Sequence, residues 1–243
     1  MSTFQIQDTV GEVVARRPTL ARLFEAARID FCCGGKKTLA EVCQEKGLDP
    51  HAFLDTLEQA TPVSDGEAFV DAASMSLTEL VNHILQTHHA YLREELPRLN
   101  MLTERVLSVH GADDPRLREV RQTFLTLASE LASHMMKEEQ VLFPMICQLE
   151  RSDARPVFHC GSIANPIRQM GLEHHDAGAA LERMCTLTDD FTPPTWACNT
   201  YRAMLDALDH LEHDMHQHVH KEDNVLYPRA IQREAELAGR THV

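Results

Sequence analysis

The sequence is poor in glycine, proline and aromatic side chains. Gly and Pro together make 21 of its 243 residues, which is below the ~12% of average usage. Aromatic residues make 5% of the chain, and β-branched residues show little alternation. Since few turns separate the elements, each element should be long. The composition predicts an all-α protein with enough length for one sizeable core and a small second unit.

Basic residues are also scarce. The chain has 23 Lys and Arg against 37 Asp and Glu, a formal net charge of −14. Because a nucleic-acid-binding surface needs clustered Lys and Arg, we expect no nucleic-acid partner. No uncharged apolar run approaches the ~18 residues of a membrane span, and the first eight residues do not resemble an export signal. We therefore expect a soluble, cytoplasmic protein without a membrane partner.

Cysteine and histidine give opposite signals. Seven cysteines are an odd number, and their spacing matches no disulfide framework, so reduced thiols are expected. Fifteen histidines are more informative. Eleven lie in four segments predicted to be helices: His83, His88, His89, His134, His174, His175, His210, His213, His216, His218 and His220. Clustered histidine suggests a metal site.

Residues 1–60 carry three short helical patterns. Thr9 with Glu12 and Thr38 with Glu41 have the spacing of a capping box. Asp49-Pro50 offers an N-cap followed by proline at the first helical position. These signals predict a small helical domain. Residues 61–75 lose the apolar period and contain Pro and Gly, which is typical of a linker.

Residues 76–243 contain four longer helical segments. Ser76 begins the first, Asp114-Pro115 the second, Asn165-Pro166 the third and Thr192-Pro193-Pro194 the fourth. Segments of roughly 30 residues are about 45 Å long as α-helices, and short connections make neighbouring helices antiparallel. We expect an up-down-up-down four-helix bundle.

The bundle contains an internal repeat. The stretch His134 to Pro144 recurs 84 residues later as His218 to Pro228, with His, Lys, Glu, Val, Leu and Pro at matching places. A looser match pairs residues 87–90 with residues 173–176. The repeat predicts two helical hairpins of similar design.

Each copy of the repeat carries a histidine and a glutamate four residues apart, which places both on one helix face. A single pair such as His134/Glu138 is more often solvated. Its recurrence as His218/Glu222, with histidines on both other helices, favours metal binding. Four imidazoles and two carboxylates suit two adjacent metals bridged by the carboxylates, with open positions for a small ligand. These donors suit iron, and manganese and zinc stay open.

The helical pattern with these two pairs resembles a hemerythrin-like di-iron domain. Asp30-Phe-Cys-Cys-Gly-Gly-Lys-Lys-Thr-Leu39 resembles the small N-terminal domain of the Repair of Iron Centres family. Together the two resemblances cover nearly the whole chain in the family's order. The resemblance implies a non-haem centre of two iron ions, with six metal ligands: His89, His134, Glu138, His174, His218 and Glu222.

Within this set, Glu138 and Glu222 would bridge the two ions. The first-helix ligand has an alternative, because His88 and His89 are adjacent and point about 100° apart on a helix. Counting back from Leu96-Pro97, which resembles the family's helix ending, favours His89. Glu173 is a candidate supporting or alternative ligand.

Cys32 and Cys33 precede the helix expected near Thr38 and stand beside two lysines. A helix N-terminus and nearby ammonium groups favour a thiolate, so this pair is a candidate redox, nitrosation or iron-transfer site. The alternative is a tight turn with two ordinary thiols, and the family resemblance favours function. We expect this loop to dock over the bundle.

The other histidines and cysteines receive structural interpretations. The expectation is a solvated position for His210, His213, His216 and His220, a polar-face position for His83, a loop position for His159-Cys160, and core or surface thiols at Cys43, Cys147, Cys185 and Cys198.

The resemblance implies repair of iron-sulfur clusters damaged by nitrosative or oxidative stress, with iron supplied to damaged client proteins and nitric oxide bound at the centre. One alternative is nitric oxide capture or its reduction to nitrous oxide. A second is oxygen binding or sensing, but oxygen-binding hemerythrins resemble a site with five histidines, and only four are assigned here. Enzymatic turnover and the oligomeric state, including a homodimer, stay open.

Overall fold

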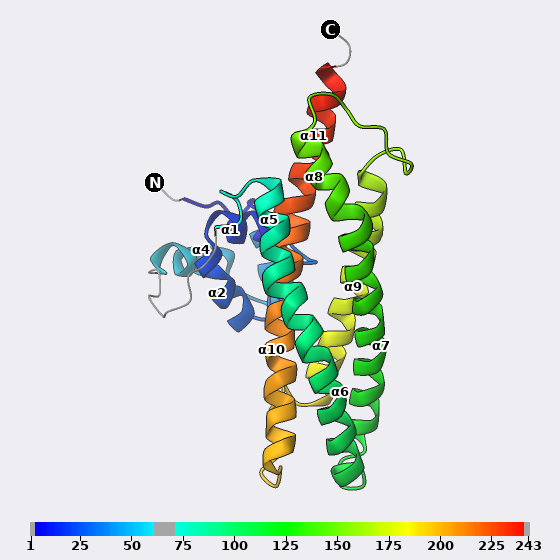
Figure 1. Cartoon of the computed structure of the whole chain (residues 1–243). Coiled ribbons are helices and arrows are strands. Elements are labelled where there is room, and N and C mark those ends of the chain that lie inside the picture. Colours follow the sequence, from blue (N-terminus) through cyan, green and yellow to red (C-terminus); the bar gives the residue numbers. More distant parts are fainter. Residues whose placement is uncertain (1–2, 61–70, 241–243) are drawn as a thin grey trace.

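The computed structural model describes residues 3–60 and 71–240, and these residues form an all-α fold (Figure 1). Across those two ranges there is no β-strand, and a single isolated bridge joins Thr9 to Thr38. None of the described helices combines the length and apolar character needed to cross a membrane. The predicted fold class is confirmed.

The N-terminal part consists of short helices. They are α1 (Val10–Arg16), the 3₁₀ turn η1 (Pro18–Leu20), α2 (Ala21–Ala26), α3 (Leu39–Lys46) and α4 (Pro50–Gln59).

The predicted caps are present in this part. Thr9 and Thr38 each form a reciprocal capping box, and the Asp49 carboxylate accepts hydrogen bonds from the first turn of α4. These helices enclose a core of their own, in which the rings of Phe24 and Phe31 lie 6.3 Å apart. Local signals in the sequence therefore determine where these helices begin.

Four long helical rods form the rest of the described chain. The first is α5 (Leu77–Ile84), η2 (Leu85–His89) and α6 (Ala90–His110); the second is α7 (Arg116–Lys137), η3 (Glu138–Leu142) and α8 (Phe143–Arg151); the third is α9 (Ala164–Leu187); the fourth is α10 (Asn199–Lys221), η4 (Glu222–Leu226) and α11 (Tyr227–Arg240). Figure 1 shows neighbouring rods running antiparallel, as the sequence predicts. The predicted linker 61–75 lies mostly outside the described residues.

The fourth rod begins later than the sequence predicts. Its first helical residue is Asn199 rather than a residue after Pro194, and Cys198 occupies the cap position. The guanidinium of Arg202 donates hydrogen bonds to the carbonyls of three residues in the connection, Pro194, Thr195 and Ala197. These bonds stabilise residues 194–197 as a turn, so the prediction of a start at Thr192 is wrong.

Two apolar clusters fill the bundle, with a polar layer between them. One cluster includes Leu127 and Leu211, and the other includes Ile84 and Leu226. The first, second and fourth rods each contain a π-helical turn at this layer, namely η2, η3 and η4. Such turns insert an extra residue into a helix and often occur at functional sites.

The N-terminal domain docks along α10 and η4 (Figure 1). The ring of Phe31 lies 6.1 Å from that of His216 and 5.5 Å from that of His220. His220 is only 4% exposed and His216 is half-buried beside the same ring, so the prediction that both are solvated is wrong. The exposed side chains of His210 and His213 agree with their prediction. Helical spacing identifies a shared face, but it does not show what covers that face.

Candidate metal centre

The six predicted ligands converge in the polar layer of the bundle. All are buried, with at most 2% of each residue exposed. They form two groups that share both glutamates: His89 and His218 with Glu138 and Glu222, and His134 and His174 with Glu138 and Glu222. In each group the candidate ligand atoms lie within 4.8 Å of one another. We call these groups the His89 half and the His134 half.

The structure distinguishes the two adjacent histidines of the first rod. Nε2 of His89 lies 3.3 Å from Oε2 of Glu138, inside the cluster. His88 turns away, with Nδ1 at 2.8 Å from the Asp214 carboxylate and Nε2 at 2.7 Å from the ammonium of Lys221. The alternative ligand His88 is therefore outside both groups.

Three of the four imidazoles are oriented by a carboxylate on Nδ1. The partners are Glu139 for His89 at 2.7 Å, Glu173 for His134 at 2.9 Å and Asp223 for His174 at 3.1 Å. A carboxylate there accepts a hydrogen bond from Nδ1–H and leaves the Nε2 lone pair directed at the centre, as in most histidine metal sites.

Sequence analysis missed Glu139 and Asp223 in this role. The signal was present, because each directly follows the bridging glutamate in its copy of the repeat.

The facing nitrogens require a cation. Nε2 of His134 lies 3.1 Å from Nε2 of His174, and two lone pairs at this distance repel unless a proton or a metal lies between them. Two nitrogens that bind one metal at about 2.1 Å and at a right angle lie about 3 Å apart. In addition, Oε2 of Glu138 and Oε2 of Glu222 are buried without a hydrogen-bond partner. The nitrogen and carboxylate donors fit two divalent cations such as iron.

The centre is strongly coupled electrostatically. Burial and the charge of Glu222 would raise the pKa of Glu138, but its close contacts with His134 and His89 lower it to about 2. Burial would lower the pKa of His134, yet its contacts with Glu138 raise it. A metal bound at this nitrogen would therefore compete with a proton for the same lone pair.

Tyr227, the first residue of α11 on the fourth rod, contacts the carboxylate of Glu138. Its hydroxyl donates a hydrogen bond to Oε1 of Glu138, and its ring stacks on His174 with an interplanar angle of 2°. Burial and the nearby carboxylates raise the pKa of Tyr227, so it remains a neutral donor. In the other copy of the repeat the equivalent residue is Phe143, whose ring stacks on His89.

The Cys32-Cys33 loop contacts the bundle next to this centre, as predicted. The Cys33 thiol donates to the backbone carbonyl of His174, with Sγ and O 3.4 Å apart. Asn224, on η4, donates from Nδ2 to the carbonyl of Cys32 at 3.1 Å. The loop thus lies directly against two ligand-bearing rods.

The predicted thiolate at Cys32 is not supported. A hydrogen bond with Cys33, burial and the carboxylate of Asp30 raise the pKa of Cys32 well above its usual range. Lys37 binds Glu45 at 2.8 Å instead of the thiol. Asp30, which sequence analysis did not single out, accepts hydrogen bonds from the backbone N–H groups of Cys32 and Gly34. The three side chains of Asp30, Cys32 and Cys33 form a small donor cluster.

A different cysteine has the more acidic thiol. Cys198 caps α10, and backbone N–H groups of Tyr201 and Thr200 together with His110 lower the pKa of Cys198 to about 7. Nε2 of His110 lies 3.1 Å from its sulfur. The sequence predicts an ordinary thiol at Cys198 because the predicted start of this helix is Thr192, six residues before the observed cap position.

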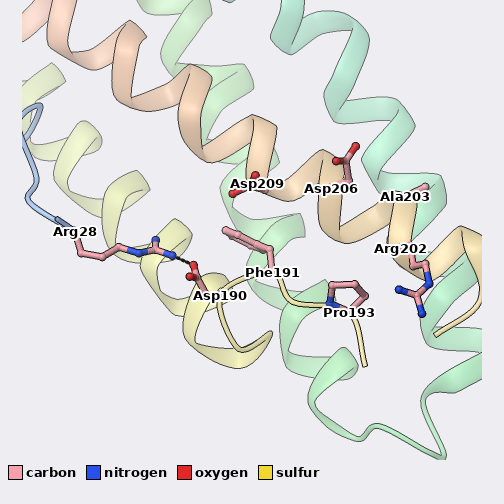
Figure 2. Close-up of a pocket in the computed structure, with 8 residues that line it drawn as sticks. All are labelled: Arg28, Asp190, Phe191, Pro193, Arg202, Ala203, Asp206 and Asp209. Carbon is pink, nitrogen blue, oxygen red and sulfur yellow. Dashed lines mark ion pairs between the residues drawn. The ribbon is translucent and has the colours of Figure 1, made fainter. Parts of the chain in front are cut away.

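A cavity of about 520 Å³ lies away from the centre, beside the α9–α10 connection (Figure 2). Figure 2 shows Arg28 of the N-terminal domain reaching Asp190, with which it forms an ion pair. Phe191 and Arg202 line the same space, and no predicted metal ligand does. Arg28 therefore provides a second contact between the N-terminal domain and the bundle.

Comparison with known proteins agrees with this architecture. Residues 80–230 match the family described as Hemerythrin HHE cation binding domain, and residues 6–61 match a domain described as Domain of Unknown function (DUF542). The chain belongs to the hemerythrin HHE family and, within it, to the group of the iron-sulfur cluster repair proteins.

Relatives within this family align over most of the chain. The iron-sulfur cluster repair protein YtfE of Citrobacter koseri is 39% identical over 223 residues, which cover 91% of this chain and 96% of the relative. The YtfE proteins of Escherichia coli O1:K1 and Escherichia fergusonii are 38% identical over 224 residues, with the same coverage. The match therefore includes both the N-terminal domain and the bundle.

Proposed function

We propose that this protein repairs iron-sulfur clusters damaged by nitrosative or oxidative stress in the cytoplasm, and that its bundle holds two releasable iron ions. The observation that carries the proposal is the pair of ligand groups sharing Glu138 and Glu222. Family membership supports the repair role, because the relatives are named for it.

In this proposal the residues of the chain bind the two iron ions and orient the imidazole ligands. His89 and His218 would hold one ion, His134 and His174 the other, and the two glutamates both. When bound, the irons supply open coordination positions and electrons, and they are also the cargo of repair. Glu139, Glu173 and Asp223 keep the protons on Nδ1, while the apolar clusters on both sides exclude water.

Metal analysis tests the binding step. Protein purified anaerobically should contain about two irons per chain, as expected of a two-metal site. Glu138→Ala/Glu222→Ala should lose both, and Glu182→Ala/Glu236→Ala, which removes two exposed carboxylates, should keep both. Stoichiometric zinc, or no metal in any variant, would overturn the di-iron proposal.

A client assay tests the repair step. The iron-loaded protein should restore the activity of an iron-sulfur enzyme inactivated by nitric oxide faster than an equal amount of free ferrous iron does. No advantage over free iron would reject repair by iron supply. Cys32→Ser/Cys33→Ser should slow the transfer, because the loop lies beside His174. An unchanged rate would exclude these thiols from the transfer.

Reduction of nitric oxide to nitrous oxide is a second candidate function. The two ligand groups are adjacent and share both carboxylates, so they would hold two ferrous ions with their open positions side by side. The pair would supply the two electrons that, with two protons, convert two nitric oxide molecules to nitrous oxide and water. Anaerobic gas analysis of the reduced protein tests this candidate. Bound nitrosyl without nitrous oxide would leave capture and exclude reduction.

A further inference from the structure

The internal repeat relates the two halves of the centre, residue by residue. Glu139, which binds His89, corresponds to Asp223, which binds His174. Lys137 corresponds to Lys221, 84 residues later. On the first and third rods the correspondence follows the ligand positions and not the looser sequence match: Glu173 precedes the ligand His174 and contacts His134, and His88 precedes the ligand His89 and contacts His218. The centre therefore has approximate two-fold equivalence of both its ligands and the residues around them.

Among the groups that face Nδ1 of the four ligand histidines, this equivalence fails at one position. Glu173 accepts a hydrogen bond from Nδ1 of His134 and forms an ion pair with Lys137. At the equivalent place His88 stacks its ring on His218, with centroids 5.1 Å apart and an interplanar angle of 4°. A stacked ring offers no acceptor to the nitrogen of its neighbour.

His218 is consequently the unsupported ligand. Its Nδ1 is buried and has no hydrogen-bond partner in the described part of the chain, whereas Nδ1 of each other ligand histidine has a carboxylate within 3.1 Å. Without an acceptor on Nδ1, neither the tautomer nor the ring orientation of His218 is fixed by a hydrogen bond. The basicity of Nε2 toward a metal is also lower.

The lysines of the two halves are also paired differently. In the His134 half the ammonium of Lys137 pairs directly with Glu173. In the His89 half Nζ of Lys221 lies 2.7 Å from the acceptor Nε2 of His88, whose own Nδ1 is bound to Asp214. Each half thus has one ammonium and one carboxylate at this place, but in the His89 half both are bound to His88 and the ligand histidine gains no acceptor from them.

We infer that the two iron sites are unequal, and that His88 makes the His89 half the one that releases its iron first. The inference rests on the proposed function, since it requires two bound metals. It deepens that function by assigning the releasable iron to one site and the retained iron to the other. His88 acts through His218 and is a positioning residue.

Release kinetics test the inference directly. The protein is loaded anaerobically with two equivalents of ferrous iron and mixed with an excess of a coloured ferrous chelator. Two phases of equal amplitude are expected, with rates about 10–100-fold apart, which is the usual effect of losing an outer hydrogen-bond partner. Release of both irons in a single phase would overturn the inference and leave di-iron binding intact. Failure to bind two irons would instead reject the proposed function.

Variants assign the phases. His88→Glu restores the missing acceptor, which Lys221 can also pair with, and should slow the fast phase toward the slow one. Glu173→Gln removes the carboxylate of the other half and should speed the slow phase. His88→Gln offers a neutral acceptor and serves if the introduced carboxylate disturbs folding beside Asp214. A fast phase unchanged in both His88 variants, with helical circular dichroism preserved, would contradict the role of His88.

Ligand removal gives an independent readout. His218→Ala should retain about one iron per chain, held by the His134 half, whereas His134→Ala should retain less, because the remaining site is the weaker one. Equal retention of iron in both variants, measured by elemental analysis, would contradict the inequality of the two halves.

Discussion

The segments α7–η3 and α10–η4 carry the same motif 84 residues apart, and they differ on their outward faces. Both direct a histidine and a glutamate at the centre. On the outward face of α7–η3, Met136 is 50% exposed, and Gln140 is exposed as well. At the equivalent places of α10–η4, His220 and Asn224 contact the N-terminal domain. One copy of the motif faces solvent and the other forms an interface.

The difference shows that two separate constraints act on one helical repeat. Inward positions are alike because both copies must supply a nitrogen and a carboxylate donor to one centre. Outward positions differ because only the second copy has a domain packed against it. The polar residues there bind backbone carbonyls, so a polar stripe on a helix is not by itself evidence of solvent exposure.

The starts of the two rods extend the comparison. Asp114 and Cys198 occupy equivalent positions before α7 and α10. The Asp114 carboxylate accepts from the backbone N–H of Arg116, and Cys198 is the N-cap residue of α10, where nearby backbone N–H groups lower the pKa of its thiol. Both side chains are acids held next to a helix N-terminus, where negative charge is favoured.

The largest expected effect, on the free energy of unfolding, tests whether the two copies of the motif are packed alike. Leu127 and Leu211 are equivalent and both fully buried in one cluster. Leu127→Ala and Leu211→Ala should each lower the free energy of unfolding by about 2–5 kcal/mol, because each leaves a cavity. Urea denaturation of the metal-free protein measures this. A cost confined to one variant would show that the copies are not packed equivalently.

The next effect concerns a position where the copies differ. Tyr227→Phe removes the hydroxyl that binds the buried Glu138 carboxylate and makes the start of α11 match the start of α8, where Phe143 stands. The expected loss is about 1.5–3 kcal/mol, typical of a hydrogen bond to a charged group. It should be seen in chemical denaturation at neutral pH without metal. A loss below about 0.5 kcal/mol would mean that Glu138 is satisfied by its histidines alone.

A smaller effect tests the difference between the outward faces of the two copies. Asn224→Ala removes hydrogen bonds to the carbonyls of Phe31 and Cys32 and should weaken the docking of the N-terminal domain by about 1–2 kcal/mol. The domain then opens more often and exposes Cys32, so Cys32 should be alkylated roughly 5–30-fold faster, which is the same free energy written as a change in the opening equilibrium. Mass spectrometry of a Cys198→Ser protein measures the rate. Gln140→Ala, the matched control on the exposed copy, should change nothing; equal acceleration by both would argue against a specific clamp.

The smallest effect concerns the cap of α10. With a pKa of about 7, half of the Cys198 thiol is deprotonated near neutral pH. Because the thiolate is the reactive form, alkylation by iodoacetamide should rise with pH and level off above about pH 8. His110→Ala should move the midpoint upward by less than one unit, since backbone N–H groups still stabilise the thiolate. A midpoint near 8.5 in the wild-type protein would contradict the acidic thiol.

Helix starts followed from the sequence wherever the cap and its partner were local. Thr9, Thr38, Asp49 and Ser76 all cap the helices predicted for them. The start at Asn199 did not follow, because the Arg202 side chain holds the preceding residues in a turn. The pairs His134/Glu138 and His218/Glu222 also followed from spacing alone. Helical geometry puts residues four apart on one face whatever surrounds them.

Tertiary structure decided the properties that depend on a neighbour from another segment. It placed His89 rather than His88 in the cluster, packed His216 and His220 against Phe31, and left Nδ1 of His218 without an acceptor. It also buried Cys32 and brought His110 to the sulfur of Cys198. The sequence by itself determined which residues share a helix face, because that depends on backbone periodicity. Which faces meet, and hence which groups are desolvated or paired, depends on how distant segments pack.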